Sequence, residues 1–320
     1  MTDVFHAGER AVQQRAGVAE RMAEVGPRVI RQALPEQHRM FFAQLPFLVV
    51  GSVDAEGQPW ASVLAQPPGF VSTPDASQLQ VQALPGASDP LARTLALGAA
   101  LGVLGIEPHT RRRNRVNGTV SAVQRTGFTL QVTQSFGNCP KYIQAREPRY
   151  VAPPDAPDQA SVTTQLDLLG QQWVQSADTF FIATAHPQPL QDAGCGSRHG
   201  VDVSHRGGKP GFVRLEVDAA GQQWLTVPDF MGNFFFNTLG NLLLQPLAGL
   251  LFMNYDNGDL LHVAVQAEVV WDGPELARFV GAQRLLRMRV HQATYRPAAL
   301  PLRWGEAQLS PVLNATGSWT

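Results

Sequence analysis

The sequence predicts a mainly β protein in which one small barrel fold is used twice, with helices at the periphery. Runs of alternating apolar and polar residues, typical of strands, follow one another along most of the 320 residues. The 24 prolines and 29 glycines supply the turns between these strands. The same order of strand, turn, helix and buried strand occurs in each half of the chain, which indicates an internal repeat.

Composition narrows the class of protein. Apolar residues make up 44% and charged residues 16% of the chain, so a substantial core is expected and global disorder is not. A net charge of −1 provides no basic field, so no nucleic-acid partner is expected. The 2 cysteines cannot form a disulfide framework. Because the polar N-terminus lacks a signal-like apolar run, we expect a cytoplasmic protein without membrane attachment.

The first half begins with helix-forming residues and then changes to strands. Helices are predicted within residues 1–45, at 9–22 and 28–32, with a break at Gly26-Pro27. Residues 46–145 are predicted to form the first barrel domain, which begins with a β-hairpin. Its predicted strands cover residues 47–53, 59–66, 78–83, 100–106, 114–124 and 127–134, with a helix at 90–97.

The second half is introduced by a proline-rich segment. Residues 146–165 are predicted to form a surface linker. Residues 166–320 are predicted to form a second barrel domain that carries the main ligand site. Residues 186–208 are interpreted as a long excursion that runs into a glycine-rich loop, SHRGGKP. Strands are predicted at 179–184, 211–217, 224–227 and 248–254, and helices at 166–176 and 233–244.

Matching patterns define the predicted repeat. The tripeptide at 57–59 (GQP) is matched with the tripeptide at 208–210 (GKP), each before a strand. Residues 84–106 parallel 227–253, and residues 111–120 parallel 259–269, which makes Arg113 the counterpart of His262. If two barrels of one chain pack together as protomers do, Arg113 or Arg115 reaches a cofactor phosphate held by the second half.

The segment 230–255 contains no charged residue and no histidine, and it is long enough to raise the question of a membrane span. Four amides recur at every fourth residue, however, and form one polar stripe on a helix: Asn233, Asn237, Asn241 and Gln245. Amides facing lipid are costly, so an amphipathic helix is the better interpretation. Its first N–H groups favour an anion such as phosphate; the alternative is a stripe that faces water.

The SHRGGKP segment places Arg206 and Lys209 beside two glycines. Glycines allow the backbone to approach a ligand closely, and the two cations favour an anion. A surface loop with solvated charges is an equally good interpretation of so short a motif.

Three phrases of this sequence are similar to those of a known family: DVSHRGGKPGFV, VPDFMGNFFFNTLGNLLLQP and FGNCPKYIQ. They resemble two-barrel members of the pyridoxamine 5′-phosphate oxidase-like family, which have the FMN-binding split-barrel fold. The resemblance covers nearly the whole chain and is densest at 202–269. It implies two tandem split β-barrels, noncovalently bound FMN, and a flavin-dependent oxidoreductase that acts on a small molecule, with reduced nicotinamide as a candidate electron donor. It leaves open a homodimer, and also a non-catalytic module that binds or senses flavin, deazaflavin or heme.

The resemblance also implies a set of cofactor-binding residues. In the family, basic and hydroxyl side chains hold the flavin phosphate, but Asn237 and Thr238 fall where the oxidase has a basic pair. Neutral hydrogen bonds are weaker than charge-assisted ones, so the phosphate charge must be met by cations elsewhere. The predicted cofactor-binding residues are Arg113, His205, Arg206, Lys209, Pro210, Thr226, Val227, Pro228, Asp229, Asn233, Asn237, Thr238 and His262. No catalytic acid or base and no metal ligand is predicted.

The remaining patterns are weaker. The basic run 109–115 lacks interleaved aromatic residues and is interpreted as a solvated hairpin, with nucleic-acid contact as the alternative. Cys139 is interpreted as a packing residue, because no base can be identified beside it. The stretch 6–9 (HAGE) has no predicted role beyond the start of a helix. A metal site is disfavoured by the spacing of Cys195, His199 and His205.

Overall fold

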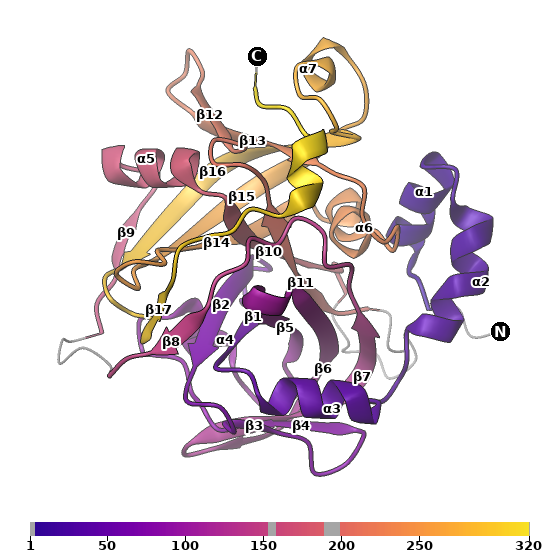
Figure 1. Cartoon of the computed structure of the whole chain (residues 1–320), viewed down its shortest axis with the longest axis vertical. Helices are drawn as coiled ribbons and strands as arrows, with labels where there is room; N and C mark the ends of the chain where they lie inside the picture. The colour runs from indigo at the N-terminus through magenta and orange to yellow at the C-terminus, as the bar shows by residue number, and fades with distance from the viewer. Residues whose placement is uncertain (1–3, 153–157, 189–198, 320) are drawn as a thin grey trace.

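The computed structural model describes residues 4–152, 158–188 and 199–319 (Figure 1). Two large antiparallel sheets carry most of this part of the chain, one formed by each half. The sheets curl into two adjacent barrels with short helices at their edges, which confirms the predicted fold of two tandem split barrels (Figure 1). The boundaries of the linker at 146–165 stay a prediction.

The first sheet has the strand order β2-β1-β5-β6-β7-β4-β3. Its strands are β1 (Phe47–Val53), β2 (Pro59–Ala65), β3 (Val71–Ser72), β4 (Gln78–Val81), β5 (Ala100–Glu107), β6 (Arg112–Gln124) and β7 (Gly127–Gly137). The short helix α4 (Pro90–Thr94) precedes β5, and the 3-10 turn η1 (Pro108–Thr110) precedes β6. The predicted hairpin of β1 and β2 is confirmed.

The second sheet has the order β11-β10-β14-β15-β16-β13-β12. Its strands are β10 (Thr179–Ala185), β11 (Val201–Gly207), β12 (Arg214–Val217), β13 (Gln223–Asp229), β14 (Leu247–Met253), β15 (Leu260–Val270) and β16 (Arg284–Arg296), and β9 (Ser161–Thr163) pairs with β16. The helices of this half are α5 (Leu168–Ser176), α6 (Asn237–Leu244), α7 (Pro274–Ala277) and the 3-10 helix η2 (Pro311–Ala315). A separate ribbon pairs β8 (Pro148–Tyr150) with β17 (Leu302–Trp304).

The N-terminal helices are α1 (Ala7–Arg15), α2 (Ala19–Val29) and α3 (Glu36–Ala43). The predicted break at Gly26-Pro27 is wrong, because α2 runs through both residues and the chain turns at Gly17, whose φ is 70°. Pro27 lies in the last turn of α2, where it removes a single helical hydrogen bond. Gly26 is required by packing, because a Cβ there would lie 2.4 Å from the ring of Phe5.

The two sheets share strand order and also register. Leu104 on β5 pairs with Arg115 on β6, and at the equivalent place Leu251 on β14 pairs with His262 on β15. Both β6 and β15 then change register three residues further on, at 117/118 and at 264/265. The predicted repeat is therefore confirmed, but the counterpart of His262 is Arg115 and not Arg113.

The halves pack on each other in a reciprocal way. A Cβ at Gly102 of β5 would lie 2.5 Å from the carbonyl oxygen of Val201, and a Cβ at Gly249 of β14 would lie 2.2 Å from that of Pro59. Gly102 and Gly249 are equivalent positions, and so are Val201 and Pro59, as in a two-fold interface between identical subunits. A shared hydrophobic core, which includes Val49 of the first half, lies between the barrels.

Three predictions in the second half need correction. Residues 201–207 form the edge strand β11, so SHRG belongs to a strand and not to a loop. Because β11 is the equivalent of β2, the tripeptide at 208–210 follows its strand, whereas the tripeptide at 57–59 precedes β2. Helix α6 begins at Asn237, four residues later than predicted, because Phe234 and Phe236 adopt left-handed backbone angles. Of the amide stripe, Asn241 is buried, with 4% exposed, and bonds Thr184, whereas Asn233, Asn237 and Gln245 are half-buried.

Candidate anion site between the two barrels

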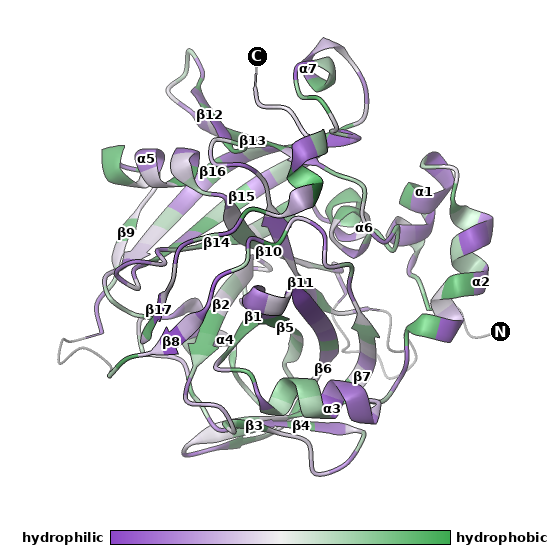
Figure 2. Ribbon diagram, viewed as in Figure 1, coloured by the Kyte–Doolittle hydropathy of each residue, from purple (hydrophilic) through white to green (hydrophobic). Residues whose placement is uncertain are grey.

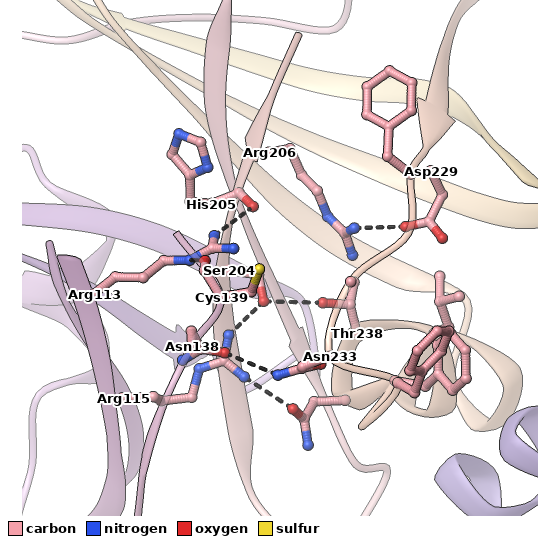
Figure 3. Close-up of a pocket in the computed structure, with 16 residues that line it drawn as sticks. Arg113, Arg115, Asn138, Cys139, Ser204, His205, Arg206, Asp229, Asn233 and Thr238 are labelled. Atoms are coloured by element: carbon pink, nitrogen blue, oxygen red, sulfur yellow. Dashed lines mark hydrogen bonds and ion pairs between the residues drawn. The ribbon is translucent and has the colours of Figure 1, made fainter. Parts of the chain in front are cut away.

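A cavity of about 90 Å³ lies where the two halves meet at the beginning of α6 (Figure 3). The first half contributes the start of β6 and the segment after β7. The second half contributes the ends of β11 and β13 and the loop before α6. The start of β6 stands out as hydrophilic in Figure 2, which fits its position at this polar cavity.

Arg115 is the most deeply buried cation of the site, with 4% of its side chain exposed. Its guanidinium forms an ion pair with Asp202 and donates hydrogen bonds to Ser204 Oγ (2.5 Å) and Asn237 Oδ1 (3.1 Å). Its Nε–H has no hydrogen-bond partner among the described residues. Since buried donors are normally satisfied, this one indicates a place for a ligand or water.

Arg113 lies two residues before Arg115 and therefore on the same face of β6. Its Nε donates to the carbonyl of Cys139 (2.8 Å) and its Nη1 to that of His205 (3.4 Å). Burial lowers the pKa of Arg113 to about 10, so the side chain stays protonated at neutral pH. Within the part of the chain that the structure describes, no carboxylate pairs with it, so its charge is available to an anion.

Arg206 closes the cavity from the end of β11. Its Nη1 lies 2.6 Å from Oδ1 of Asp229 (Figure 3). Oδ2 of the same carboxylate is 2.9 Å from Nε of Arg284. One carboxylate is thus shared by two guanidinium groups, which leaves this side of the cavity positive.

The beginning of α6 adds neutral donors. Ser204 Oγ lies 3.3 Å from Thr238 Oγ1 (Figure 3). Both hydroxyls are within hydrogen-bond distance of Asp202 Oδ2. The N-cap of α6 is Phe236, which offers no side-chain acceptor to the first turn. The first N–H groups of the helix and its positive dipole end therefore favour an anion in the cavity.

The loop before α6 is strained. Phe234 and Phe236 have φ values of 64° and 61°, a region that non-glycine residues rarely adopt. The guanidinium groups of Arg21 and Arg284 lie over these rings, at 5.5 Å and 4.9 Å from the ring centres. Backbone strain of this kind persists where surrounding contacts fix it, and it clusters at functional sites.

Glu9 of α1 lies outside the cavity lining and supports it through Asn237. It is 4% exposed, hydrogen-bonds Asn237 through Oε1 and accepts the His6 N–H at 2.8 Å through Oε2. Burial raises the pKa of Glu9 to about 8, and burial lowers the pKa of His6 to about 3, so both side chains are neutral at pH 7. The HAGE stretch therefore begins a helix, as expected, and also supports Asn237 beside the cavity.

The structure brings seven of the predicted cofactor-binding residues to the cavity: Arg113, His205, Arg206, Asp229, Asn233, Asn237 and Thr238. It places the other six outside the cavity lining: Lys209, Pro210, Thr226, Val227, Pro228 and His262. Lys209 Nζ bonds the carbonyl oxygen of Thr316 at 2.6 Å, and Thr226 is fully buried within β13. Whether any of these residues contacts a cofactor stays a prediction.

The two histidines of this set face elsewhere. The imidazole of His205 points away from Ser204 and packs against Phe181, and burial lowers its pKa well below the ordinary value (Figure 3). His262 is fully buried, and its Nδ1 lies 2.9 Å from the carbonyl oxygen of Ala61.

Sequence reasoning gave Arg115 as the alternative to Arg113, and it missed Ser204 and Glu9. Arg113 and Arg115, like Ser204 and Arg206, are spaced by two residues, which places each pair on one face once the segments are recognised as strands. Glu9 follows His6 by three residues and completes a capping box.

The equivalent place in the other half is closed by an internal ion pair. Ser62, the counterpart of Ser204, bonds Asp89 Oδ1 at 2.5 Å. Asp89 is the N-cap of α4, is 2% exposed, and forms an ion pair with Arg296. Asp158 from the linker pairs with the same guanidinium at 3.1 Å. A protein carboxylate therefore occupies the anion position beside α4.

The described residues contain no group of three histidine, cysteine or acidic side chains arranged to hold a metal ion. Cys139 is half-buried and lines the cavity, where its carbonyl accepts from Arg113. Cys195 lies outside the described residues. Among the helices in the described ranges, none is long and apolar enough to cross a membrane.

Comparison with known proteins identifies the family. Residues 34–161 match the family model described as pyridoxamine 5′-phosphate oxidase. This segment belongs to the pyridoxamine 5′-phosphate oxidase-like family, a class of split-barrel proteins. The matched segment lies mainly in the first half, whereas the resemblance in sequence is densest at 202–269. A search of curated proteins found no match.

Several solved structures are similar to parts of the chain. A candidate pyridoxamine 5′-phosphate oxidase from Lactobacillus delbrueckii is 17% identical, over 33% of this chain and 95% of its own, with a TM-score of 0.27. A conserved hypothetical protein from Mycobacterium tuberculosis is 16% identical, over 42% and 86% of the two chains, with a TM-score of 0.28. The inhibitor of motility from Bacillus subtilis is 9% identical over 77% and 88%, with a TM-score of 0.19.

The residues present fit the phosphate end of FMN. Three guanidinium groups, two hydroxyls and the open start of α6 surround the cavity, and a phosphate needs such donors. The volume of about 90 Å³ is below the roughly 300 Å³ at which drug-sized sites begin. The cavity therefore suits a phosphate group, and the ring system of a flavin would lie outside it.

Proposed function

We propose that the chain binds FMN noncovalently, with its phosphate in the cavity at the start of α6, and acts as a flavin-dependent oxidoreductase on a small molecule. The observation that carries this proposal is the convergence of Arg113, Arg115 and Arg206 on one small cavity between the barrels. Membership of the family supports FMN as the phosphate-bearing ligand. Reduced nicotinamide is the electron donor that we would test first.

In this proposal the chain's own residues bind and orient the cofactor. Arg113 contributes the charge that no protein carboxylate neutralises in the described part of the chain, and Ser204 and Thr238 contribute hydroxyl donors. Asn237 bridges Arg115 and Glu9, which fixes the first turn of α6. FMN, when bound, supplies the exchange of one or two electrons with a substrate.

A non-catalytic module that holds flavin, deazaflavin or heme is the second candidate function. The observation that favours it is the lack of a free proton donor among the described residues of the lining, because Asp229 is held by two guanidinium groups and the imidazole of His205 packs against Phe181. Oxidation of reduced nicotinamide by the FMN-loaded protein separates the two functions: turnover supports the enzyme, and its absence with several acceptors supports the module.

The binding proposal is tested by FMN titration of the purified chain, followed by flavin fluorescence and calorimetry. We expect one FMN per chain, because Asp89 occupies the equivalent place in the other half. Arg113→Gln should weaken FMN binding by about 10- to 100-fold, the worth of a hydrogen bond to a charged group. The matched control is Arg112→Gln, an exposed neighbour that should leave the affinity unchanged. A colourless protein that also fails to take up added FMN would refute the proposal.

A further inference from the structure

A second, larger cavity lies away from the anion site. It has a volume of about 570 Å³, within the roughly 300–1,000 Å³ of small-molecule sites. It shares no lining residue with the cavity at α6. Its walls come from the end of α5, the start of β10, the end of β14, and the segment around β17.

Aromatic side chains form much of the wall. Trp304 packs edge-on against Tyr255, with ring centres 5.1 Å apart, and Trp173 lines the same cavity. Arg146 already lies over the ring of Tyr255, with its guanidinium carbon 4.1 Å from the ring centre. The cavity wall thus holds one cation against an aromatic face, an arrangement that is favourable for cations in general.

The charges at the cavity are mainly negative. Asp178, Asp256 and Glu306 line it, against the single guanidinium of Arg146. Asp178 Oδ2 pairs with Arg146 Nη2 at 2.6 Å, whereas its buried Oδ1 has no hydrogen-bond partner in the described part of the chain. Asp256 and Glu306 are exposed at the rim. Three carboxylates against one guanidinium favour a cation and disfavour an anion.

We propose that this cavity is a binding site for a small organic cation with a flat or aromatic body. The aromatic walls contact the body of the ligand, Asp256 and Glu306 attract its charge, and Asp178 Oδ1 accepts one of its N–H groups. The proposal does not depend on FMN, since the two cavities are built from different residues.

The experiment uses the full chain and three probes of nearly the same shape: benzamidine, which is a cation, benzamide, which is neutral, and benzoate, which is an anion. Calorimetry should show binding in the order benzamidine, benzamide, benzoate, with the same affinities in the presence of saturating FMN. The double variant Asp256→Asn/Glu306→Gln should weaken benzamidine binding by about two- to tenfold, as expected for two exposed charges.

The matched control is Glu20→Gln/Glu24→Gln, which removes the same charge from exposed positions of α2. It should bind benzamidine as the unmodified chain does. The proposal is overturned if benzoate binds as well as benzamidine, if both double variants behave alike, or if benzamidine does not bind at millimolar concentration.

Discussion

In each half of the chain, a serine of an edge strand lies beside the start of a short helix. The groups that surround the two serines differ. Beside α4, Ser62 and Arg296 meet the carboxylate of Asp89, which belongs to the protein. Beside α6, Ser204 and three arginines surround a cavity, and the helix has no capping side chain. The same scaffold therefore supports an internal ion pair in one half and an open anion site in the other.

The largest expected effect is on the closed side. Asp89→Ala removes an N-cap and leaves the buried guanidinium of Arg296 with Asp158 as its carboxylate partner in the described part of the chain. Breaking a buried ion pair costs about 3–5 kcal/mol, so urea unfolding should show a loss of this size. FMN affinity should be unchanged. The exposed carboxylate of Asp75 is the control, and Asp75→Ala should have a smaller effect. Equal losses would show that the buried ion pair of Asp89 adds no stability beyond that of an exposed carboxylate.

The next effect concerns Glu9, which supports the open side through its hydrogen bond to Asn237. Its pKa is raised from 4.5 to about 8 on folding, so the folded chain holds a proton that the unfolded chain releases between these values. The stabilisation is complete below pH 4.5 and is lost as pH rises through 8, with a slope of at most about 1.4 kcal/mol per pH unit. Glu9→Gln should flatten this slope in urea unfolding measured from pH 5 to 9.

The Glu9→Gln variant also loses one accepted hydrogen bond, because an amide has a single oxygen. Its stability at pH 5 should therefore be lower by about 0.5–1.5 kcal/mol. Glu20→Gln on exposed α2 is the control and should keep the original slope. An unchanged slope in the Glu9 variant would mean that this carboxyl is ionised in the folded protein.

A smaller effect compares the two equivalent serines directly. Ser204→Ala should weaken FMN binding by about five- to tenfold, which is the loss of affinity expected when one hydrogen bond is removed. Ser62→Ala should leave FMN affinity unchanged, because that hydroxyl bonds Asp89. Isothermal titration of both variants measures the difference, and equal effects on FMN binding would contradict the assignment of one site to α6.

The smallest effect is expected at Lys209. Its ammonium group bonds the carbonyl oxygen of Thr316 and lies outside the cavity lining, so Lys209→Ala should change FMN affinity by less than about twofold. A loss of FMN affinity comparable to that of Arg113→Gln would show that Lys209 contacts the phosphate, as the sequence predicts.

Elements with a regular hydropathy pattern were predictable from the sequence, and elements defined by contacts between the halves were not. The hairpin of β1 and β2 follows from alternating residues on either side of a turn. Strand β11 was missed because Asp202 is buried by its ion pair with Arg115, which comes from the other half. A polar residue that faces another domain looks like one that faces water, so hydropathy cannot distinguish them.

The candidate site was predictable in part. Arg206, Asn237 and Thr238 follow from the family resemblance, and Arg113 follows from the repeat. Arg115 followed only as the alternative to Arg113, because the equivalence of β6 and β15 depends on which residues pair across the strands, and the matched sequence patterns differ from that pairing by two positions. The late start of α6 depends on left-handed angles at two phenylalanines, which helix propensity does not favour.

Because both barrels belong to one polypeptide, dilution cannot separate the two walls of the cavity. A site built between two free subunits disappears when the subunits dissociate, and its apparent affinity then depends on protein concentration. Here Arg113 and Ser204 stay within reach of each other at any concentration. Because the two halves have separate sequences within one chain, their interface need not be symmetric. A substitution at the start of α6 therefore leaves the start of α4 unaltered.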